Sequence, residues 1–418
     1  TTALADRLQV RAQPDQPGYL LLNPCSFARR AALELDGAKA PLPIEGPVKA
    51  CQLDGDKLRA VVEVPALGFA WIPREGPPGT PAMTARLRLG DPKSNTIRNE
   101  FFEVEVDPAT GAMKAIRDHK THVNRLGQRL VFNPGSRMVA TKVEVTSSGP
   151  ALGQIVSEGQ LLGEQDQPLA NFRQRLRAWL GRPLLEMRIE IVPIQPAAGY
   201  PWHAYFGCRF AWRDERALLL RGINGTGYVS NHPRPQTAEY LDIRLGRQST
   251  AIFPGGLPFH QRQEGRMLDV ILMPEGEKTT TFDLGIGLDR EAPMLTTLGI
   301  ISPIAVVPTT KGPPHIGASG WLFHLDAMNL LLTRLIPGAL EVVAEGTEAK
   351  PEPRDVVTAR ILECGGHSGH AEFRCVRDPQ RAVLLDARGN FMLDATRTGD
   401  TVFLEVSPND LVHVQVEF

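Results

Sequence analysis

Apolar side chains in this sequence recur at every second residue, the spacing that places successive side chains on opposite faces of a β-strand. Residues 185–191 alternate four apolar residues with three charged ones. Residues 172–180 alternate a mostly apolar set, interrupted by Gln174, with three arginines, and residues 412–418 alternate in the same way. This pattern predicts strands with one buried and one wet face, and therefore an all-β fold.

Turn-forming residues lie between these alternating segments. Residues 102–106 and 113–116 are separated by a Pro- and Gly-containing stretch that suits a hairpin, because glycine supplies a positive φ without strain. The 39 glycines and 35 prolines are spread along the chain, which favours many short strands over long helices. Helical spacing is weak, so only residues 4–11 and 327–335 are expected to hold a helical turn or two.

Two breaks divide the chain into three parts. Residues 74–81 are rich in proline and glycine, and residues 308–318 combine prolines and glycines with small polar residues, as linkers do. A chain of 418 residues is long enough for about two or three domains. We therefore expect a small β domain in residues 1–80, a large central β-sandwich in residues 90–305 and a small β domain in residues 318–418.

Charge and hydropathy exclude several classes of partner. The 46 lysines and arginines nearly balance the 47 aspartates and glutamates, without a long block of either sign. We therefore expect no partnership with nucleic acid or with an anionic membrane surface. The longest mainly apolar run, residues 298–308, falls far short of the roughly 20 apolar residues that span a bilayer.

Sequence motifs of several enzyme classes are absent. The chain has neither a phosphate-binding loop nor a dinucleotide-binding fingerprint, and it lacks the Gly-x-Ser-x-Gly turn of many serine hydrolases. The two carboxylates of a glycoside hydrolase cannot be chosen from 47 acidic residues. No catalytic residue is therefore assigned.

Two groups of residues contain possible metal ligands. Four of them lie within twelve residues: Cys364, His367, His370 and Cys375. Their spacing matches no common zinc finger, so exposed histidines and buried thiols are the favoured interpretation. His324 and Asp326 could face the same side of a strand, but no second cluster completes a coordination shell. We assign no metal site, and five scattered cysteines predict buried thiols rather than a disulfide framework.

Sugar sites combine aromatic rings with polar neighbours. Residues 200–212 hold the densest aromatic group of the chain, for which core packing and ligand contact are both open alternatives. Residues 228–235 and 255–266 are loops rich in histidine and arginine, and loops on rigid sheets often carry binding residues. The candidate substrate-binding residues are Tyr205, Tyr228, His232, Arg234, His260 and Arg262.

Four segments carry a resemblance to a known family. They read LNPCSFARR at residues 22–30, VPALGF at residues 64–69, IRNEFFEV at residues 97–104 and YFGCRFAW at residues 205–212. Together they resemble the C-terminal, β-sandwich half of glycoside hydrolase family 38, the retaining, metal-dependent α-mannosidases. The resemblance implies a large central sandwich of the galactose mutarotase type, flanked by smaller β-sandwich domains, and a link to carbohydrate.

The resemblance also implies a division of labour. In this family an N-terminal α/β barrel carries the zinc ion and the nucleophilic aspartate, and no segment here matches those motifs. We therefore expect a non-catalytic portion, inactive alone and without a cofactor, that completes a carbohydrate site, with zinc only in the missing N-terminal half. The expected partners are a mannoside-like carbohydrate and that catalytic domain. A basic loop of the family's β half approaches the active site, and His260 and Arg262 occupy the similar place, although the family's double arginine is missing.

Two other interpretations stay open. The chain could be a free-standing carbohydrate-binding or assembly module, or a β-sandwich lyase or epimerase that uses His260 and Tyr228 as acid and base. The resemblance to bacterial members leads us to expect a soluble protein of the cytoplasm or periplasm, without deciding between the two.

Overall fold

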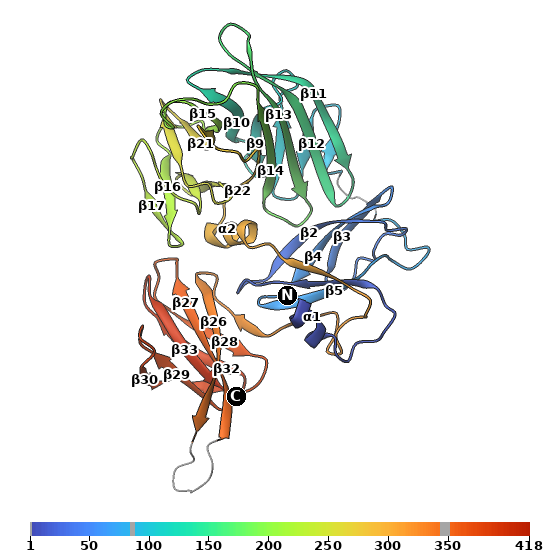
Figure 1. Ribbon diagram of the computed structural model, residues 1–418, viewed down its shortest axis with the longest axis vertical. Helices are drawn as coiled ribbons and strands as arrows, with labels where there is room; N and C mark the ends of the chain where they lie inside the picture. Colours follow the sequence, from blue (N-terminus) through green and yellow to red (C-terminus); the bar gives the residue numbers. More distant parts are fainter. Residues whose placement is uncertain (1, 84–87, 343–351) are drawn as a thin grey trace.

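The computed structural model describes residues 2–83, 88–342 and 352–418, and strands make up most of their regular structure (Figure 1). Two short helices, α1 (Thr2–Leu8) and α2 (Pro293–Ile301), accompany six sheets in this part of the chain. The predicted all-β class is confirmed. No helix in the described ranges is long and apolar enough to cross a membrane.

The central unit, in the upper part of Figure 1, is a sandwich of an eight-stranded and a nine-stranded sheet. In order, the first sheet contains β20 (His260–Gln263), β21 (Met267–Pro274), β15 (Tyr205–Ala211), β10 (Asn124–Asn133), β9 (Met113–Asp118), β8 (Phe102–Val106), β7 (Thr96–Arg98) and β6 (Gly90–Asp91). The second contains β11 (Arg137–Ser148), β12 (Leu152–Leu162), β13 (Pro168–Trp179), β14 (Leu185–Pro193), β22 (Thr281–Leu288), β19 (Gln248–Phe253), β18 (Leu241–Leu245), β16 (Leu218–Ile223) and β17 (Thr226–Val229). Apolar side chains from both sheets form one core.

Strand β13 shows how the alternating sequence sets the two faces of a sheet. Phe172, Leu176 and Ala178 are buried in the core between the sheets, and the arginines between them point to the other face. Gln174, the polar residue in the apolar set, is fully buried, and its side-chain oxygen accepts a hydrogen bond from Gln128 Nε2 at 2.9 Å. A buried amide is tolerated because it is hydrogen-bonded.

The first unit combines a three-stranded sheet with a four-stranded sheet. The three-stranded sheet contains β2 (Arg29–Asp36), β4 (Lys57–Val64) and β3 (Val48–Asp54). The four-stranded sheet contains β23 (Ala305–Thr309), β1 (Gly18–Leu22), β5 (Gly68–Pro73) and β24 (Ser319–Trp321). Strands β23 and β24 follow the central unit in the sequence, whereas β1 and β5 precede it. The division into residues 1–80, 90–305 and 318–418 stays a prediction. Strand pairing additionally places β23 and β24, within residues 305–321, in a sheet with β1 and β5.

The last unit packs two further sheets against each other. One contains β25 (Phe323–Leu325), β28 (Gly369–Cys375), β32 (Thr401–Val406) and β31 (Arg397–Thr398). The other contains β26 (Leu330–Val342), β27 (Glu352–Glu363), β33 (Leu411–Glu417), β29 (Arg381–Leu385) and β30 (Phe391–Asp394). Buried residues from both sheets, such as Phe373 and Val414, share one core.

The helical expectations were partly right. The turn expected in residues 4–11 overlaps α1, but the turn expected in residues 327–335 is wrong, because Leu330 onward belongs to β26 and pairs with β27. A run of leucines fits a buried strand and a buried helix equally well, and only the pairing with a distant strand decides. Helix α2 was missed because its sequence is apolar nearly throughout and has no helical period.

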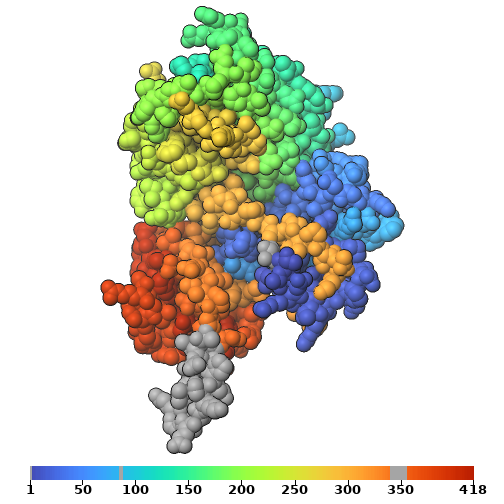
Figure 2. Space-filling view, in the orientation of Figure 1, coloured from blue at the N-terminus to red at the C-terminus, as the bar shows by residue number. Residues whose placement is uncertain are grey.

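The three units meet around α2. Figure 1 shows this helix between the central unit and the two lower ones, and Figure 2 shows the segment after it at the same junction. Arg29 of the first unit donates hydrogen bonds to the carbonyl oxygens of Gly299 and Ser302 at 3.2 and 2.6 Å. The backbone N–H of Leu332 donates to the Ser26 hydroxyl at 3.1 Å, so the first and last units also contact each other.

Candidate functional site

Three loops of the central unit form one surface. They are residues 194–204 before β15, residues 230–240 before β18 and residues 254–259 before β20. The backbone N–H of Thr237 donates to the Pro258 carbonyl at 3.0 Å, and that of Arg262 donates to the Pro233 carbonyl at 2.8 Å. These bonds hold the second loop against the third loop and the start of β20.

Aromatic side chains and one arginine from these loops contact each other. The rings of Trp202 and Phe259 meet edge to face, with centroids 5.8 Å apart. The Arg234 guanidinium carbon lies 4.9 Å from the Trp202 ring centroid and 5.8 Å from that of Tyr200. We call these four residues, Tyr200, Trp202, Arg234 and Phe259, the aromatic platform.

The aromatic platform is open to solvent. Tyr200 is 56% exposed and Phe259 is 47% exposed, although both are large hydrophobic residues. Within the described residues the Arg234 guanidinium has no carboxylate partner, so its N–H donors are available. Exposed aromatic rings beside free N–H donors suit a ligand that has C–H faces and hydroxyl groups, as a pyranose sugar has.

Two of the predicted residues take part in this surface. Arg234 belongs to the aromatic platform itself. His232 shapes the turn before it, because its Nδ1 accepts a hydrogen bond from the Arg234 backbone N–H at 3.0 Å. Tyr228 is exposed on β17, the edge strand of the nine-stranded sheet, opposite Arg221 in the register.

His260 is not at the surface. Its side chain is fully buried, and its Nε2–H donates to the Thr237 carbonyl oxygen at 2.8 Å. Its Nδ1 is buried and has no partner in the described part of the chain. Burial without a counter-charge lowers the pKa of His260 to about 4, so the ring is neutral at pH 7. The geometry gives His260 a supporting role behind the second loop, and Arg262 remains half-buried next to it.

Tyr205 is likewise buried, in a network of polar side chains. Its hydroxyl donates to Asp269 at 2.7 Å, and Arg209 donates two hydrogen bonds to the same carboxylate, at 2.7 and 2.8 Å. Burial and the negative charge of Asp269 raise the pKa of Tyr205 above its ordinary value. Gln263 of β20 joins the network at 2.8 Å from Asp269. Tyr205 therefore anchors β20 and β21 to β15 instead of facing a ligand.

Sequence reasoning did not single out several of these residues. Tyr200, Trp202 and Phe259 lay in stretches that were recognised as aromatic or polar, but none was named as a candidate. Asp269 was missed altogether, although a lone aspartate within the apolar run of β21 is a signal for a buried, paired carboxylate.

The possible metal ligands do not form a cluster. Among the residues that the structure describes, no group of three or more His, Cys, Asp or Glu side chains could hold a metal ion. His367 and His370 are exposed, whereas Cys364 and Cys375 are buried free thiols, as are the other three cysteines. The His324 ring lies 6.2 Å from that of Trp321, and Asp326 accepts a hydrogen bond from the Glu372 backbone.

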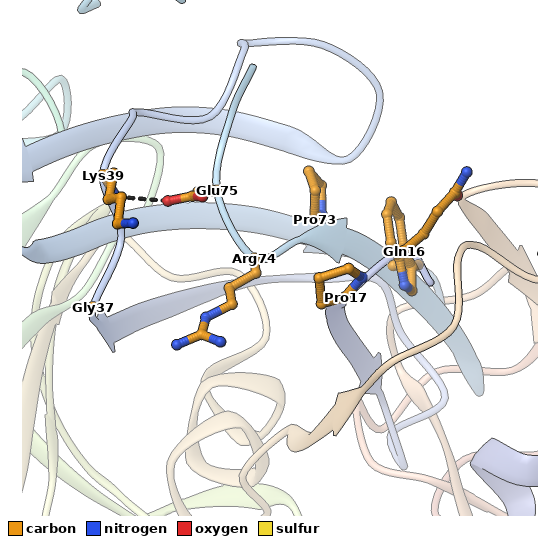
Figure 3. A pocket seen from close by; sticks show the side chains of 8 residues that line it. Gln16, Pro17, Gly37, Lys39, Pro73, Arg74 and Glu75 are labelled. Carbon is orange, nitrogen blue, oxygen red and sulfur yellow. Dashed lines mark hydrogen bonds between the residues drawn. The ribbon is translucent and has the colours of Figure 1, made fainter. Parts of the chain in front are cut away.

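A separate hollow of about 510 Å³ lies in the first unit, and Figure 3 shows the side chains around it. They come from the segment before β1, the segment after β2 and the end of β5. The backbone N–H of Lys39 donates to the Glu75 carboxylate at 2.8 Å across it (Figure 3). None of the predicted substrate-binding residues lines this hollow, so it is not part of the candidate site.

Comparison with known proteins shows a likeness of fold only. No protein-family model and no curated protein matches the sequence with significance. An alpha-mannosidase from Enterococcus faecalis V583 has a similar structure over 100% of this chain, with a TM-score of 0.65 and 11% sequence identity. A glycosyl hydrolase family 38 protein from Enterococcus faecalis also covers 100% of the chain, with a TM-score of 0.63 and 12% identity.

The chain spans only part of those structures, 58% of the first and 60% of the second. A galactose mutarotase-like protein from Lactobacillus casei ATCC 334 matches 46% of the chain with a TM-score of 0.29 and 10% identity. The whole chain therefore has the fold of part of two larger structures, an alpha-mannosidase and a glycosyl hydrolase family 38 protein.

Proposed function

We propose that this chain is the non-catalytic, β-rich portion of a glycoside hydrolase of the α-mannosidase type, and that it supports and completes a carbohydrate site. The observation that carries the proposal is the full coverage of the chain by structures of that type, of which it spans 58% and 60%. Catalysis then belongs to the remaining part of the parent protein, and this chain supplies shape and sugar contacts.

The aromatic platform is the proposed contact surface for a mannoside-like carbohydrate. Its rings offer stacking surface, and Arg234 offers N–H donors to hydroxyl oxygens. His260 and Tyr205 support it from behind, through Thr237 and through the network around Asp269. Zinc belongs, in this proposal, to the catalytic half, as the resemblance to family 38 implies.

A turnover assay tests the division of labour. The chain, incubated with an aryl α-mannoside and zinc, should release no phenol, whereas a longer product that includes the catalytic half should release it in a zinc-dependent reaction. Hydrolysis by the 418-residue chain alone would contradict the proposal.

Saturation-transfer NMR with methyl α-mannoside tests the aromatic platform. We expect weak, roughly millimolar binding, because half of the pocket is supplied from elsewhere. Phe259→Ala should weaken the signal at least about threefold through lost ring contacts. Phe391→Ala is the matched control, since Phe391 is also an exposed phenylalanine beside an arginine, Arg381, but lies in the last unit. Equal effects of both substitutions would reject the aromatic platform as the contact surface.

A second candidate function is a free-standing carbohydrate-binding module. It is favoured by the assembly of the aromatic platform wholly from loops of the central unit. Micromolar affinity of the isolated chain for a mannoside would favour it over a portion of a larger site. The lyase or epimerase alternative is not supported, because it needs proton exchange between His260 and a substrate, and the His260 ring is fully buried.

A further inference from the structure

A groove of about 910 Å³ lies where the three units meet. Its walls come from β2 of the first unit, from β13, β14 and α2 of the central unit, and from the residues between β25 and β26 in the last unit. It is separate from the aromatic platform, none of whose residues lines it. A volume of this size is within the range of roughly 300–1,000 Å³ that small-ligand pockets have.

Positive charge dominates the groove. Seven arginines and four carboxylates line it, although the chain as a whole carries a net charge of −1. Four of the arginines have carboxylate partners; the pairs are Arg30 with Glu63, Arg177 with Glu34, Arg182 with Glu186 and Arg188 with Asp283. The other three, Arg29, Arg175 and Arg290, have none in the described ranges.

Arg175 is one of the three arginines of the groove without a carboxylate partner among the described residues. The register of the nine-stranded sheet places it between Val156 on β12 and Arg188 on β14, so neither neighbour offers a negative charge. Its guanidinium has no hydrogen-bond partner in the part of the chain that the structure describes, and burial together with Arg177 and Arg188 lowers its pKa. Like charges opposite each other on a sheet are unfavourable.

Arg29 and Arg290 are the other two arginines of the groove that have no carboxylate partner among the described residues. Arg29 donates only to backbone carbonyl oxygens, which carry no full charge, and burial lowers the pKa of both arginines. The Nε atom of each is buried and has no acceptor among the described residues. A buried donor without a partner costs free energy, and a buried unpaired cation costs more. A bound anion would supply the missing acceptors.

The groove also has apolar walls. Leu184, Leu295, Ile300 and Ile304 line it beside the arginines. Guanidinium groups bind phosphate, sulfate and carboxylate through two parallel hydrogen bonds, and apolar walls pack against a carbon skeleton. We propose that this groove binds a small ligand that carries two or more anionic groups, held by Arg29, Arg175 and Arg290.

Isothermal titration of the whole chain at low salt tests the proposal. The probes are pyrophosphate, a sulfated disaccharide and the same disaccharide without sulfate. We expect at least one anionic probe to bind, the unsulfated sugar not to bind in this groove, and Arg175→Gln to weaken anion binding about tenfold. Added salt should weaken it further.

Arg173→Gln is the matched control. Arg173 lies on the same face of the same strand, two residues from Arg175, but it pairs with Glu158 and Glu190 and does not line the groove. Its replacement should leave anion binding unchanged. Arg175→Gln should melt no lower than the wild type because it removes an unpaired charge, so lost binding cannot be ascribed to unfolding.

The relative affinities of the two anionic probes distinguish two classes of ligand. Tighter binding of pyrophosphate indicates a phosphorylated ligand, and tighter binding of the sulfated disaccharide indicates an anionic sugar. The proposal is overturned if neither anionic probe binds, or if Arg173→Gln and Arg175→Gln weaken binding equally. Phe259→Ala should not affect these titrations, so the groove and the aromatic platform can fail independently.

Discussion

His260 is a titratable side chain that the fold holds in its neutral form. Its pKa in the folded protein is about 4, below the ordinary 6.5, so between these values the unfolded chain binds a proton that the folded chain does not. The contribution of the neutral His260 to the free energy of unfolding is therefore fully present above about pH 6.5 and is lost as the pH falls towards 4. We expect this group to remove about 3 kcal/mol of unfolding free energy over that interval.

Replacement of His260 by glutamine checks this at the residue scale. Glutamine keeps a donor for the Thr237 carbonyl but does not titrate, so urea unfolding between pH 4 and pH 6.5 should depend less on pH than in the wild type. His370→Gln removes an exposed histidine instead and should preserve the wild-type pH dependence. A pH dependence that is unchanged in His260→Gln would disprove the neutral, buried state.

At the scale of elements, strand β24 forms one edge of the four-stranded sheet in the first unit. It pairs with β5, which lies about 250 residues earlier in the chain. The pairing is close because Gly68 has no side chain: a Cβ there would lie 2.3 Å from the Gly320 carbonyl oxygen. We expect Gly68→Ala to lower the unfolding free energy by about 1–3 kcal/mol, because backbone must shift to make room. Thermal unfolding measures the effect.

Gly369→Ala is the control for this substitution. Gly369 is also in a strand, β28, but no atom lies within 4 Å of the position that its Cβ would take. Alanine should be neutral or slightly stabilising there. Similar losses of stability at both positions would show that close approach of β24 does not explain the glycine at position 68.

At the scale of the whole molecule, Gln52 joins the first unit to the central one. Its Oε1 accepts hydrogen bonds from the backbone N–H groups of Ala151 and Leu152, both at 3.1 Å, and its Nε2 donates to the Ser147 hydroxyl at 2.9 Å. Gln52→Met keeps the length of the side chain but removes the acceptor of the Ala151 and Leu152 N–H groups, whereas the Ser147 hydroxyl still donates to the Leu152 carbonyl oxygen. We expect a loss of about 1–3 kcal/mol and a less cooperative transition, as the two units separate more easily.

Gln160→Met provides the comparison. Gln160 donates to Asn171 at 3.0 Å within the central unit and near its surface, so its loss should cost little. Calorimetry of both variants separates the cases. If Gln52→Met unfolds in one transition at the wild-type temperature, this contact does not hold the units together.

The sequence by itself determined the strands and their faces. Alternation is a local property, so residues 172–180 and 185–191 could be assigned to strands, with Arg173 and Arg175 on the face away from the core. It also indicated parts of two loops of the candidate site, although residues 228–229 and 260–263 of the expected loops belong to β17 and β20. It misassigned residues 327–335 and missed α2, because apolar runs without a period carry no local signal that distinguishes strand from helix.

Only the tertiary structure decided which distant residues meet. Trp202, Arg234 and Phe259 lie in three separate loops, and the burial of His260 depends on how those loops pack. The pairing of β23 with β1 and of β24 with β5 likewise has no local signal in the sequence. Contacts of this kind follow from packing between segments far apart in the chain, and a single sequence records the segments but not their pairing.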